Sequence, residues 1–395
     1  SPSLSCCLNK TTTKPGASGP KPFRPRQHAD VIVIGAGIVG AACAHVLARQ
    51  GLSVLVLDAR LGGATAAGMG HLVVLDDNPA ELALSQASVA LWHEWGPRMT
   101  ADQPGCAYTN CGTLWLAAND AEMAGAEEKA RRMRDHGLAC EMLDATALRR
   151  AEPSLHPDLV GALKVSGDSI VYAPNAAQWL LQQAPHKIRF EQAEATHIDG
   201  GRVQLADGSW REAQAVVLAA GIHATRFCPE LPIQPKKGHL LITDRYPGTV
   251  QHQLVELGYI TNAHQTTGTS VAFNLQPRPT GQLLLGSSRQ FDTTDPTVDQ
   301  DVLAQMLRRA LDYMPGLADL NAIRTWTGFR ATTPDSMPII GRHPTRDQLW
   351  LAVGHEGLGV TTAPATAELL AAQMTGGGLP LDPAPFAAQR FSLPA

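Results

Sequence analysis

The sequence predicts a mixed α/β (α+β) protein in which a parallel sheet flanked by helices is interrupted by stretches of antiparallel strands. The apolar run 31–34 is typical of a strand buried on both faces of a parallel sheet, and it leads through three glycines into an Ala-rich helix. Similar apolar strands recur at 215–219 and at 349–353. Between about 235 and 288 the pattern instead alternates, as in antiparallel strands, so we expect two interleaved domains.

The opening strand runs into a G-x-G-x-x-G turn at Gly35, Gly37 and Gly40, then a helix that Gly51 is placed to end, then a second apolar strand ending at Asp58. The first glycine permits a tight turn, the second lets backbone amides approach a pyrophosphate, and the third lets the helix pack against the strand. The helix N-terminus then faces the negative charge. Asp58 lies 18 residues after Gly40, where an acidic side chain can accept hydrogen bonds from a ribose. These features together favour a Rossmann-like dinucleotide site over a βα turn without a ligand.

Composition argues against several other classes of function. The chain has 44% apolar and 17% charged residues, as expected for a globular protein long enough for two domains. Its formal net charge of −4 argues against nucleic acid as the main partner. No run approaches the ~20 apolar residues of a membrane span, so we expect a cytoplasmic protein, with any contact to the inner membrane made through partners. The seven cysteines include no CxxC pair, so we expect neither a metal site nor a disulfide framework.

The remaining elements are predicted from local patterns. Residues 1–28 lack apolar periodicity, and we expect a mobile tail or an arm that orders against a partner. Amphipathic patterns predict helices at 79–95, 121–137, 144–150, 175–183 and 302–314. Strands are expected at 113–117, 194–198, 202–205, 239–243, 270–275 and 282–286. The last helix is expected over 363–374, with Pro364 in its first turn and Thr361 or Thr362 as its cap.

Four further segments carry a family resemblance. They are Ala64-Thr-Ala-Ala-Gly-Met-Gly70, Val217-Leu-Ala-Ala-Gly221, Trp326-Thr-Gly-Phe-Arg330-Ala-Thr-Thr-Pro-Asp335-Ser-Met-Pro-Ile-Ile-Gly341 and Val353-Gly-His-Glu-Gly-Leu-Gly359. In this order they resemble the glycine oxidase/D-amino-acid oxidase (DAO) family of FAD-dependent oxidoreductases, over about residues 29–390. The resemblance implies a Rossmann-like FAD-binding domain, discontinuous in sequence, interleaved with an antiparallel-sheet substrate domain.

The resemblance also implies where the domains and the cofactor contacts lie. The FAD-binding domain is expected over 29–100, 148–232 and 326–390, and the substrate domain over 101–147 and 233–325. The residues expected to contact non-covalent FAD are Gly35, Gly37, Ile38, Val39, Gly40, Asp58, Ala59, Arg60, Ala64, Thr65, Ala66, Gly68, Met69, Gly70, Ala220, Gly221, Arg330, Gly354, His355, Glu356, Gly357, Leu358 and Gly359.

Arg330 is the implied substrate-binding residue. The family places an arginine there, and its planar guanidinium can hold an amino-acid carboxylate through two parallel hydrogen bonds, whereas the alternative is an ordinary surface salt bridge. Asn274 departs from the tyrosine of simple glycine oxidases, so it could bind a ring hydroxyl or a bulkier substrate, or be a plain strand residue. Gly357 stands where some relatives carry a second basic residue. A strictly glycine-like substrate is therefore not favoured.

Three histidines are further candidates for a catalytic role. His355 flanks the expected flavin edge, and His71 and His239 could approach the substrate face of the ring, although each also fits a structural histidine. Tyr259 could border the same pocket. The N-terminus of the 363–374 helix would direct partial positive charge at the flavin pyrimidine edge.

The stretch 270–289, together with 68–77, resembles the catalytic flavin subunit of bacterial D-hydroxyproline dehydrogenases, relatives of hydrogen cyanide synthase and opine dehydrogenase subunits. This implies an FAD-dependent dehydrogenase that oxidises a D- or cyclic amino acid to an imine. It also implies partner subunits that receive the electrons through a second flavin or an iron–sulfur centre. The alternatives are a self-contained glycine, sarcosine or D-amino-acid oxidase that uses oxygen, and a non-catalytic flavin-bearing subunit.

Overall fold

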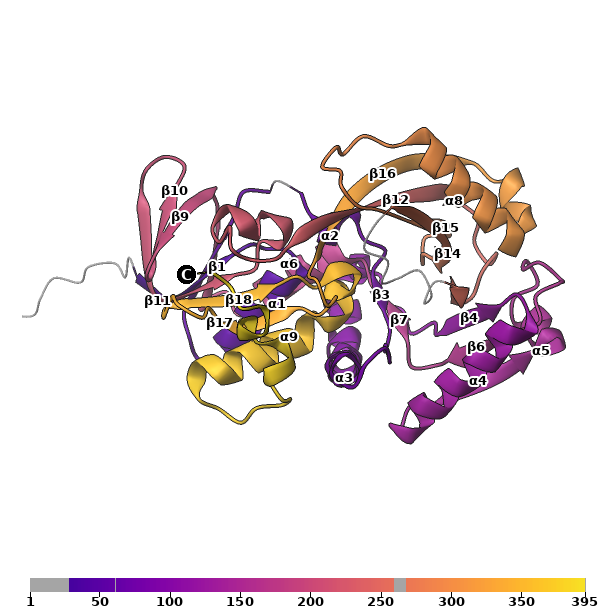
Figure 1. Cartoon of the computed structure of the whole chain (residues 1–395), viewed down its shortest axis with the longest axis horizontal. Coiled ribbons are helices and arrows are strands. Elements are labelled where there is room, and N and C mark those ends of the chain that lie inside the picture. The colour runs from indigo at the N-terminus through magenta and orange to yellow at the C-terminus, as the bar shows by residue number, and fades with distance from the viewer. Residues whose placement is uncertain (1–27, 61, 259–267, 395) are drawn as a thin grey trace, which may run out of the picture.

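The computed structural model describes residues 28–60, 62–258 and 268–394, and arranges them around two large β-sheets (Figure 1). Residues 1–27 of the expected tail, and Tyr259, lie outside these ranges, whereas His28, counted with the tail, begins β1. The first sheet has the order β17-β18-β11-β1-β2-β8, with β10 and β9 continuing from β11. Its strands are β1 (His28–Ile34), β2 (Val54–Asp58), β8 (Ile188–Gln192), β9 (Ala195–Asp199), β10 (Arg202–Leu205), β11 (Trp210–Leu218), β17 (Ile339–Arg342) and β18 (Leu349–Val353).

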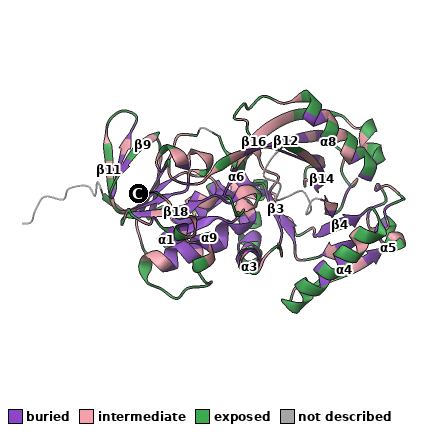
Figure 2. Ribbon diagram, in the orientation of Figure 1, coloured by how far each residue is buried: buried purple, intermediate pink, exposed green. Residues whose placement is uncertain are grey.

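The first sheet is parallel at its centre, where β1 pairs with β2 on one side and with β11 on the other. Because β1 is buried on both faces, its apolar run needs no alternation. One face is covered by the helices α1 (Ile38–Arg49), α3 (Pro79–Asp102), α6 (Ala173–Gln182) and α9 (Gly359–Thr375). Figure 2 shows the buried residues concentrated in this part of the molecule. They include Trp92, whose Nε1 donates to the carbonyl oxygens of Val360 and Thr361, both at 3.1 Å, and thereby ties α3 to α9.

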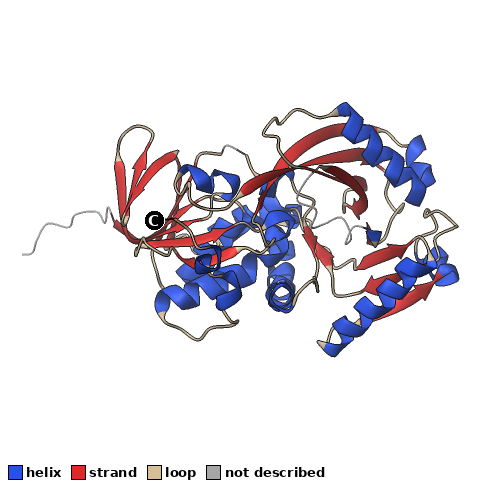
Figure 3. Ribbon diagram, viewed as in Figure 1, coloured by secondary structure: helices blue, strands red, loops and turns tan. Residues whose placement is uncertain are grey.

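The second sheet has the order β16-β12-β15-β14-β13-β4-β6-β5 and is largely antiparallel (Figure 3). Its strands are β4 (Thr113–Ala117), β5 (Cys140–Asp144), β6 (Gly161–Val165), β12 (Gln234–Arg245), β13 (Gln253–Glu256), β14 (Thr269–Pro277), β15 (Gln282–Gln290) and β16 (Ala322–Thr332). The helices α8 (Gln300–Tyr313), α4 (Asp120–Asp135) and α5 (Ala145–Ala151) pack on it. On β14, Phe273 and Leu275 face α8, so Asn274 lies on the opposite face.

Short elements connect the two sheets. The two-stranded ribbon of β3 (His71–Leu72) and β7 (Ser169–Ile170) lies between them, and α2 (Ala64–Ala67) contacts β16. The 3₁₀ turns are η1 (Pro104–Cys106), η2 (Gly221–Arg226), η3 (Pro315–Asp319), η4 (Glu356–Leu358), η5 (Ala384–Phe386) and η6 (Ala388–Phe391). Over the described ranges, no helix has the length and apolar character needed to cross a membrane.

The fold class is confirmed, but two expected domain boundaries are wrong. β6 pairs with β4 and β5, so residues 161–165 belong to the second sheet rather than to the FAD-binding part expected over 148–232. β16 pairs along its length with β12, so the second sheet extends beyond residue 326. Strand pairing between distant segments decides both boundaries, and local sequence patterns do not report it.

The start of α9 also differs from the expectation. The helix begins at Gly359, four residues early, so Pro364 lies in its second turn and Thr361 and Thr362 lie inside the helix. Neither threonine caps it. Thr361 Oγ1 donates to the carbonyl oxygen of His71 at 2.7 Å, and Thr362 Oγ1 donates to that of Leu358 at 2.8 Å.

We expect Gly40→Ala to destabilise the protein strongly. A Cβ at this position would overlap the carbonyl oxygen of Gly35, so α1 would have to move away from the turn. Such overpacking costs about 1–3 kcal/mol of the free energy of unfolding, and we expect a lower Tm with a lower FAD content on purification. The control is Gly125→Ala, in an open part of α4, which should leave Tm unchanged or raise it. Equal Tm values for the two variants would contradict this account of the turn.

Candidate active site

A cavity of about 520 Å³ lies where the carboxyl ends of β1, β2 and β11 face the second sheet. β1 lies between β2, which follows it directly in the chain, and β11, which the chain reaches much later, so the connections leave β1 in opposite directions. This switch point is where open α/β sheets bind ligands. Most residues expected to contact FAD line the cavity: Gly35, Gly37, Ile38, Val39, Asp58, Ala59, Arg60, Ala64, Thr65, Ala66, Gly68, Met69, Gly70, Ala220, Gly221, Arg330, Gly354, His355, Glu356, Gly357 and Gly359. Gly40 and Leu358 lie outside its wall. Gly40 serves the packing of α1, and Leu358 is the N-cap residue of α9.

The end of the cavity at the glycine turn fits a dinucleotide. Gly37, the N-cap of α1, has no side chain that could cap the helix, and no acidic residue stands in its first turn. Its amides therefore carry partial positive charge toward the cavity. A Cβ on Gly37 would lie 2.9 Å from Thr65 Oγ1, which accepts a hydrogen bond from the Ile38 amide at 3.0 Å. Asp58 accepts hydrogen bonds from the amides of Ala36 and Arg60, at 2.7 and 2.6 Å, which fixes its carboxylate at this end.

The other end of the cavity is built on the second sheet. The Arg330 guanidinium lies against the backbone of Gly238, where a Cβ would meet its two terminal nitrogens at 2.8 and 2.9 Å. Its Nη1 donates to the carbonyl oxygen of Ser288 at 3.2 Å. Asn274 Nδ2 donates to Ser287 Oγ at 3.1 Å, which fixes the amide orientation and turns Oδ1 into the acceptor that remains for a ligand. Both groups can bind polar parts of a small molecule held over the nucleotide.

Two of the candidate histidines line the cavity and are neutral at pH 7. Burial, and secondarily the charge of Arg278, lowers the pKa of His71 to about 4, and its Nε2 has no hydrogen-bond partner among the described residues. Burial also lowers the pKa of His355 to about 4, and its Nε2 lies 3.0 Å from Thr366 Oγ1. A neutral imidazole can donate or accept a hydrogen bond but does not supply a positive charge.

His239 does not belong to the site. On β12 the neighbouring Gly238 and Leu240 line the cavity, so the intervening side chain points to the opposite face of the strand. Its Nδ1 lies 2.8 Å from Ser288 Oγ, and its Nε2 accepts a hydrogen bond from the Asp299 amide at 2.9 Å. The expectation that it approaches the flavin is therefore wrong.

Sequence reasoning missed several residues of the cavity wall. Gly238, Leu240 and Ser287 come from the second sheet, and Ile222, His223, Arg226, Phe227 and Glu194 from the segments near the nucleotide end. Gly238 carried a usable signal, because a glycine inside a strand often marks a close approach by another group.

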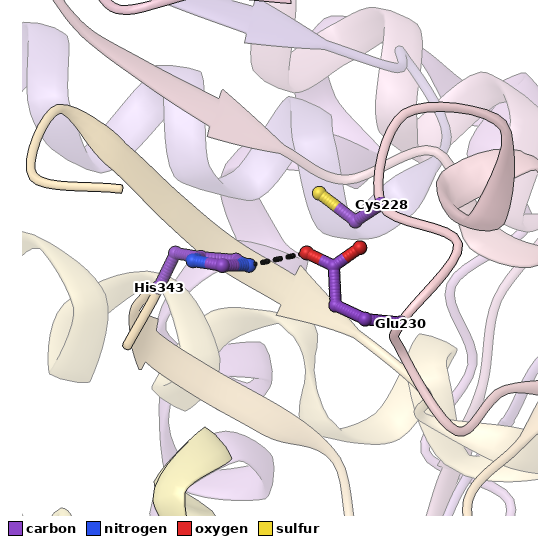
Figure 4. A group of neighbouring side chains, drawn as sticks. All are labelled: Cys228, Glu230 and His343. Carbon is purple, nitrogen blue, oxygen red and sulfur yellow. Dashed lines mark hydrogen bonds and ion pairs between the residues drawn. The ribbon is translucent and has the colours of Figure 1, made fainter. Parts of the chain in front are cut away.

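A separate cluster of Cys228, Glu230 and His343 has potential ligand atoms within 4.8 Å of one another (Figure 4). The hydrogen bonds favour a structural cluster over a cation site. The Thr345 amide donates to His343 Nδ1 at 3.2 Å, so the neutral ring carries its proton on Nε2 and donates to Glu230 Oε1 at 2.7 Å. The Arg346 guanidinium lies 3.2 Å from Cys228 Sγ, and burial raises the pKa of this thiol to about 11.

The fold and the cavity are those of a dinucleotide-binding protein whose cavity is closed by a second sheet. Comparison with known proteins gives the family: residues 30–373 match the DAO family of FAD dependent oxidoreductases, and the chain belongs to it. It is 28% identical to glycine oxidase from Pseudomonas aeruginosa, over 90% of this chain and 98% of that protein. It is 26% identical to a subunit of opine oxidase from Rhizobium meliloti, over 92% and 97% respectively. The crystal structure of glycine oxidase from Geobacillus kaustophilus superposes with a TM-score of 0.81 at 25% identity, over 91% of this chain and 98% of that chain.

We expect Gly238→Ala to weaken substrate binding without unfolding the protein. The added methyl group would meet the flexible end of Arg330 rather than backbone, so the guanidinium would be displaced and the sheet retained. Loss of a charge-assisted hydrogen bond of about 1.5–3 kcal/mol corresponds to a rise in KM of about ten- to hundredfold. The measurement is KM alongside Tm, with the open Gly316→Ala as control. An unchanged KM would show that Arg330 does not depend on this clearance.

We expect the Cys228–Glu230–His343 cluster to take up no metal. Dialysis against EDTA, and separately addition of Zn²⁺, should leave Tm unchanged, because metal binding to Nε2 would require the Thr345 amide to face a protonated Nδ1. A bound metal stabilises the folded state by mass action. A Zn²⁺-dependent rise in Tm that His343→Gln abolishes would contradict the structural assignment.

Proposed function

We propose that the chain is an FAD-dependent amino-acid dehydrogenase that oxidises the Cα–N bond of a D-configured or cyclic amino acid, with D-hydroxyproline as the best candidate, and passes the electrons to a partner subunit. The observation that carries the proposal is the pairing of Arg330 with a pre-oriented Asn274 at the end of the cavity away from the nucleotide turn. The likeness to glycine oxidases, and to a protein that is one subunit of an opine oxidase, supports it.

Arg330, Asn274 and His71 each bind a different part of the substrate. Arg330 binds the α-carboxylate through its planar guanidinium, which orients Cα toward the cofactor. Asn274 Oδ1 accepts a hydrogen bond from the substrate amine or from a ring hydroxyl, while Nδ2 donates to Ser287 and holds the amide in place. His71 offers a neutral ring on the same wall and accepts or donates a hydrogen bond without carrying a charge at pH 7. When bound, FAD supplies the acceptor for the hydride that leaves Cα.

The segment at the start of α9 supplies electrostatic support. Gly359 and Val360 line the cavity in the first turn of the helix, which has no acidic residue and no side-chain cap. The partial positive charge of this N-terminus favours negative charge at that end of the cavity. The hydrogen bond between His355 Nε2 and Thr366 Oγ1 ties the same segment to α9.

A self-contained oxidase is the second candidate, favoured by the likeness to glycine oxidase in sequence and structure. The two functions differ in the electron acceptor. A dehydrogenase would pass electrons to a second flavin or an iron–sulfur centre on a partner subunit, whereas an oxidase would reduce oxygen. A flavin-bearing subunit without its own chemistry would do neither when mixed with an amino acid alone.

We expect D-hydroxyproline to bleach the flavin absorbance of the pure protein under anaerobic conditions, and the colour to return slowly in air. Arg330→Ala should abolish bleaching at the same substrate concentration, while Arg330→Lys should retain part of it, because lysine keeps the charge but loses the bidentate geometry. Bleaching by glycine or sarcosine with fast recovery in air would establish the oxidase. Unchanged bleaching by Arg330→Ala would reject its role in substrate binding.

A further inference from the structure

Lys236 is a buried lysine that lies behind the cavity wall, in contact with the wall residue Glu356. Neither cofactor binding at the glycine turn nor substrate binding by Arg330 and Asn274 accounts for it. It lies on β12 with 1% of its side chain exposed, and its Nζ forms an ion pair with the Glu356 carboxylate. Burial, with smaller contributions from the charges of Arg330 and Arg289, lowers the pKa of Lys236. A carboxylate in contact with an amine favours its charged form, so Lys236 depends on Glu356 to remain an ammonium. An ammonium group is buried at this cost only where a close partner compensates for lost water. The pair joins the second sheet to the segment that leads into α9.

Glu356 is held in an unfavourable backbone conformation. Its φ of +56° lies in the left-handed region that glycine prefers, and its side chain is 10% exposed. Strained backbone that persists in a cavity wall often marks a functional constraint. Of the carboxylates in the described cavity wall, Asp58 and Glu194 follow β2 and β8 near the nucleotide end, which leaves Glu356 at the end that holds Arg330.

Arg330 lies next to both members of the pair. Lys236 and Arg330 are cross-strand neighbours in the β12–β16 register. A Cβ on Gly357, the residue after Glu356, would lie 3.4 Å from Arg330 Nε. Glu356 therefore contacts Lys236, the cross-strand neighbour of Arg330, and directly precedes a residue that packs against the Arg330 side chain. A carboxylate tethered this closely has a high effective concentration at the neighbouring guanidinium.

We propose that Lys236 is a positioning residue that draws the Glu356 carboxylate away from Arg330, and so prevents an internal carboxylate from occupying the place of the substrate carboxylate. Without Lys236, Glu356 would be free to turn toward the guanidinium of Arg330, the cross-strand neighbour of Lys236, whose bidentate geometry suits a carboxylate. The inference rests on the proposed function, because it requires Arg330 to bind the substrate carboxylate.

The test uses the FAD-loaded protein and pyrrole-2-carboxylate, a five-membered ring carboxylate without a Cα–H bond to oxidise. Its Kd is measured from the shift of the flavin spectrum. We expect Lys236→Met to raise this Kd about tenfold or more, and the double variant Lys236→Met/Glu356→Gln to bring it back to within about threefold of the wild type. Lys236→Arg, which keeps the charge, should restore much of the affinity. In turnover with the amino acid that the enzyme oxidises, Lys236→Met should raise KM and leave kcat nearly unchanged, as expected when an internal group competes for the site.

Two results would overturn the inference: a Lys236→Met variant that binds the probe as tightly as the wild type, or a double variant that remains as weak as Lys236→Met. The second would show that the ion pair only supports the structure. If Lys236→Met does not load FAD, the test rests on the double variant Lys236→Met/Glu356→Gln. It has no carboxylate at position 356 to compete for Arg330, so it must bind pyrrole-2-carboxylate as tightly as the wild type. Arg330→Ala separates the two proposals. If it binds the probe as tightly as the wild type, the proposed function fails and this inference fails with it.

Discussion

The fold of the site depends on a backbone contact that leaves no room for side chains. Gly40 lies against the carbonyl of Gly35, and Gly35 in turn lies against the carbonyl of Ala219 at the end of β11. This places the uncapped N-terminus of α1 at the carboxyl edge of the first sheet. Because α9 packs on α1, the same contact sets the position of the segment that begins α9. The same glycine contact therefore positions both the helix N-terminus that can bind an anionic cofactor and the neighbouring cavity wall at the start of α9.

The polar groups that we propose for substrate binding come from the other sheet, where strand geometry rather than helix termini decides what faces the cavity. Alternation on β12 directs Gly238 and Leu240 inward and His239 outward, and alternation on β14 directs Asn274 away from the helix-covered face. The missing side chain at Gly238 creates the space in which the Arg330 guanidinium lies. Strand β12 thus provides two features that position Arg330: the open space at Gly238 and the cross-strand neighbour Lys236.

Features set by local sequence could be predicted, and features set by distant pairing could not. The strand–turn–helix unit ending at Asp58 follows from glycine sterics and apolar periodicity within some thirty residues. The place of β6 in the second sheet depends on pairing with β4 and β5, which its own pattern does not specify. The orientation of His239 required the strand register. The predicted start of α9 was wrong because Pro364 was expected in the first turn of a helix. Pro364 has no amide hydrogen to donate to the carbonyl of Val360, but the distant Trp92 donates to that carbonyl instead, so the helix continues through the proline.

The ion pair of Lys236 and Glu356 could not be predicted from the sequence, since 120 positions separate its members. It is also one of several contacts that join the second sheet to the cofactor-facing segments. Trp326 Nε1 on β16 donates to the carbonyl oxygen of Ala67, the last residue of α2 and part of the cavity wall, at 3.1 Å. Hydride transfer is sensitive to the distance and angle between the reacting groups, and misplacement by about 1 Å can cost about a hundredfold in rate. Since the first sheet carries the glycine turn and the second sheet carries the residues that we propose for substrate binding, the contacts between the two sheets maintain this geometry.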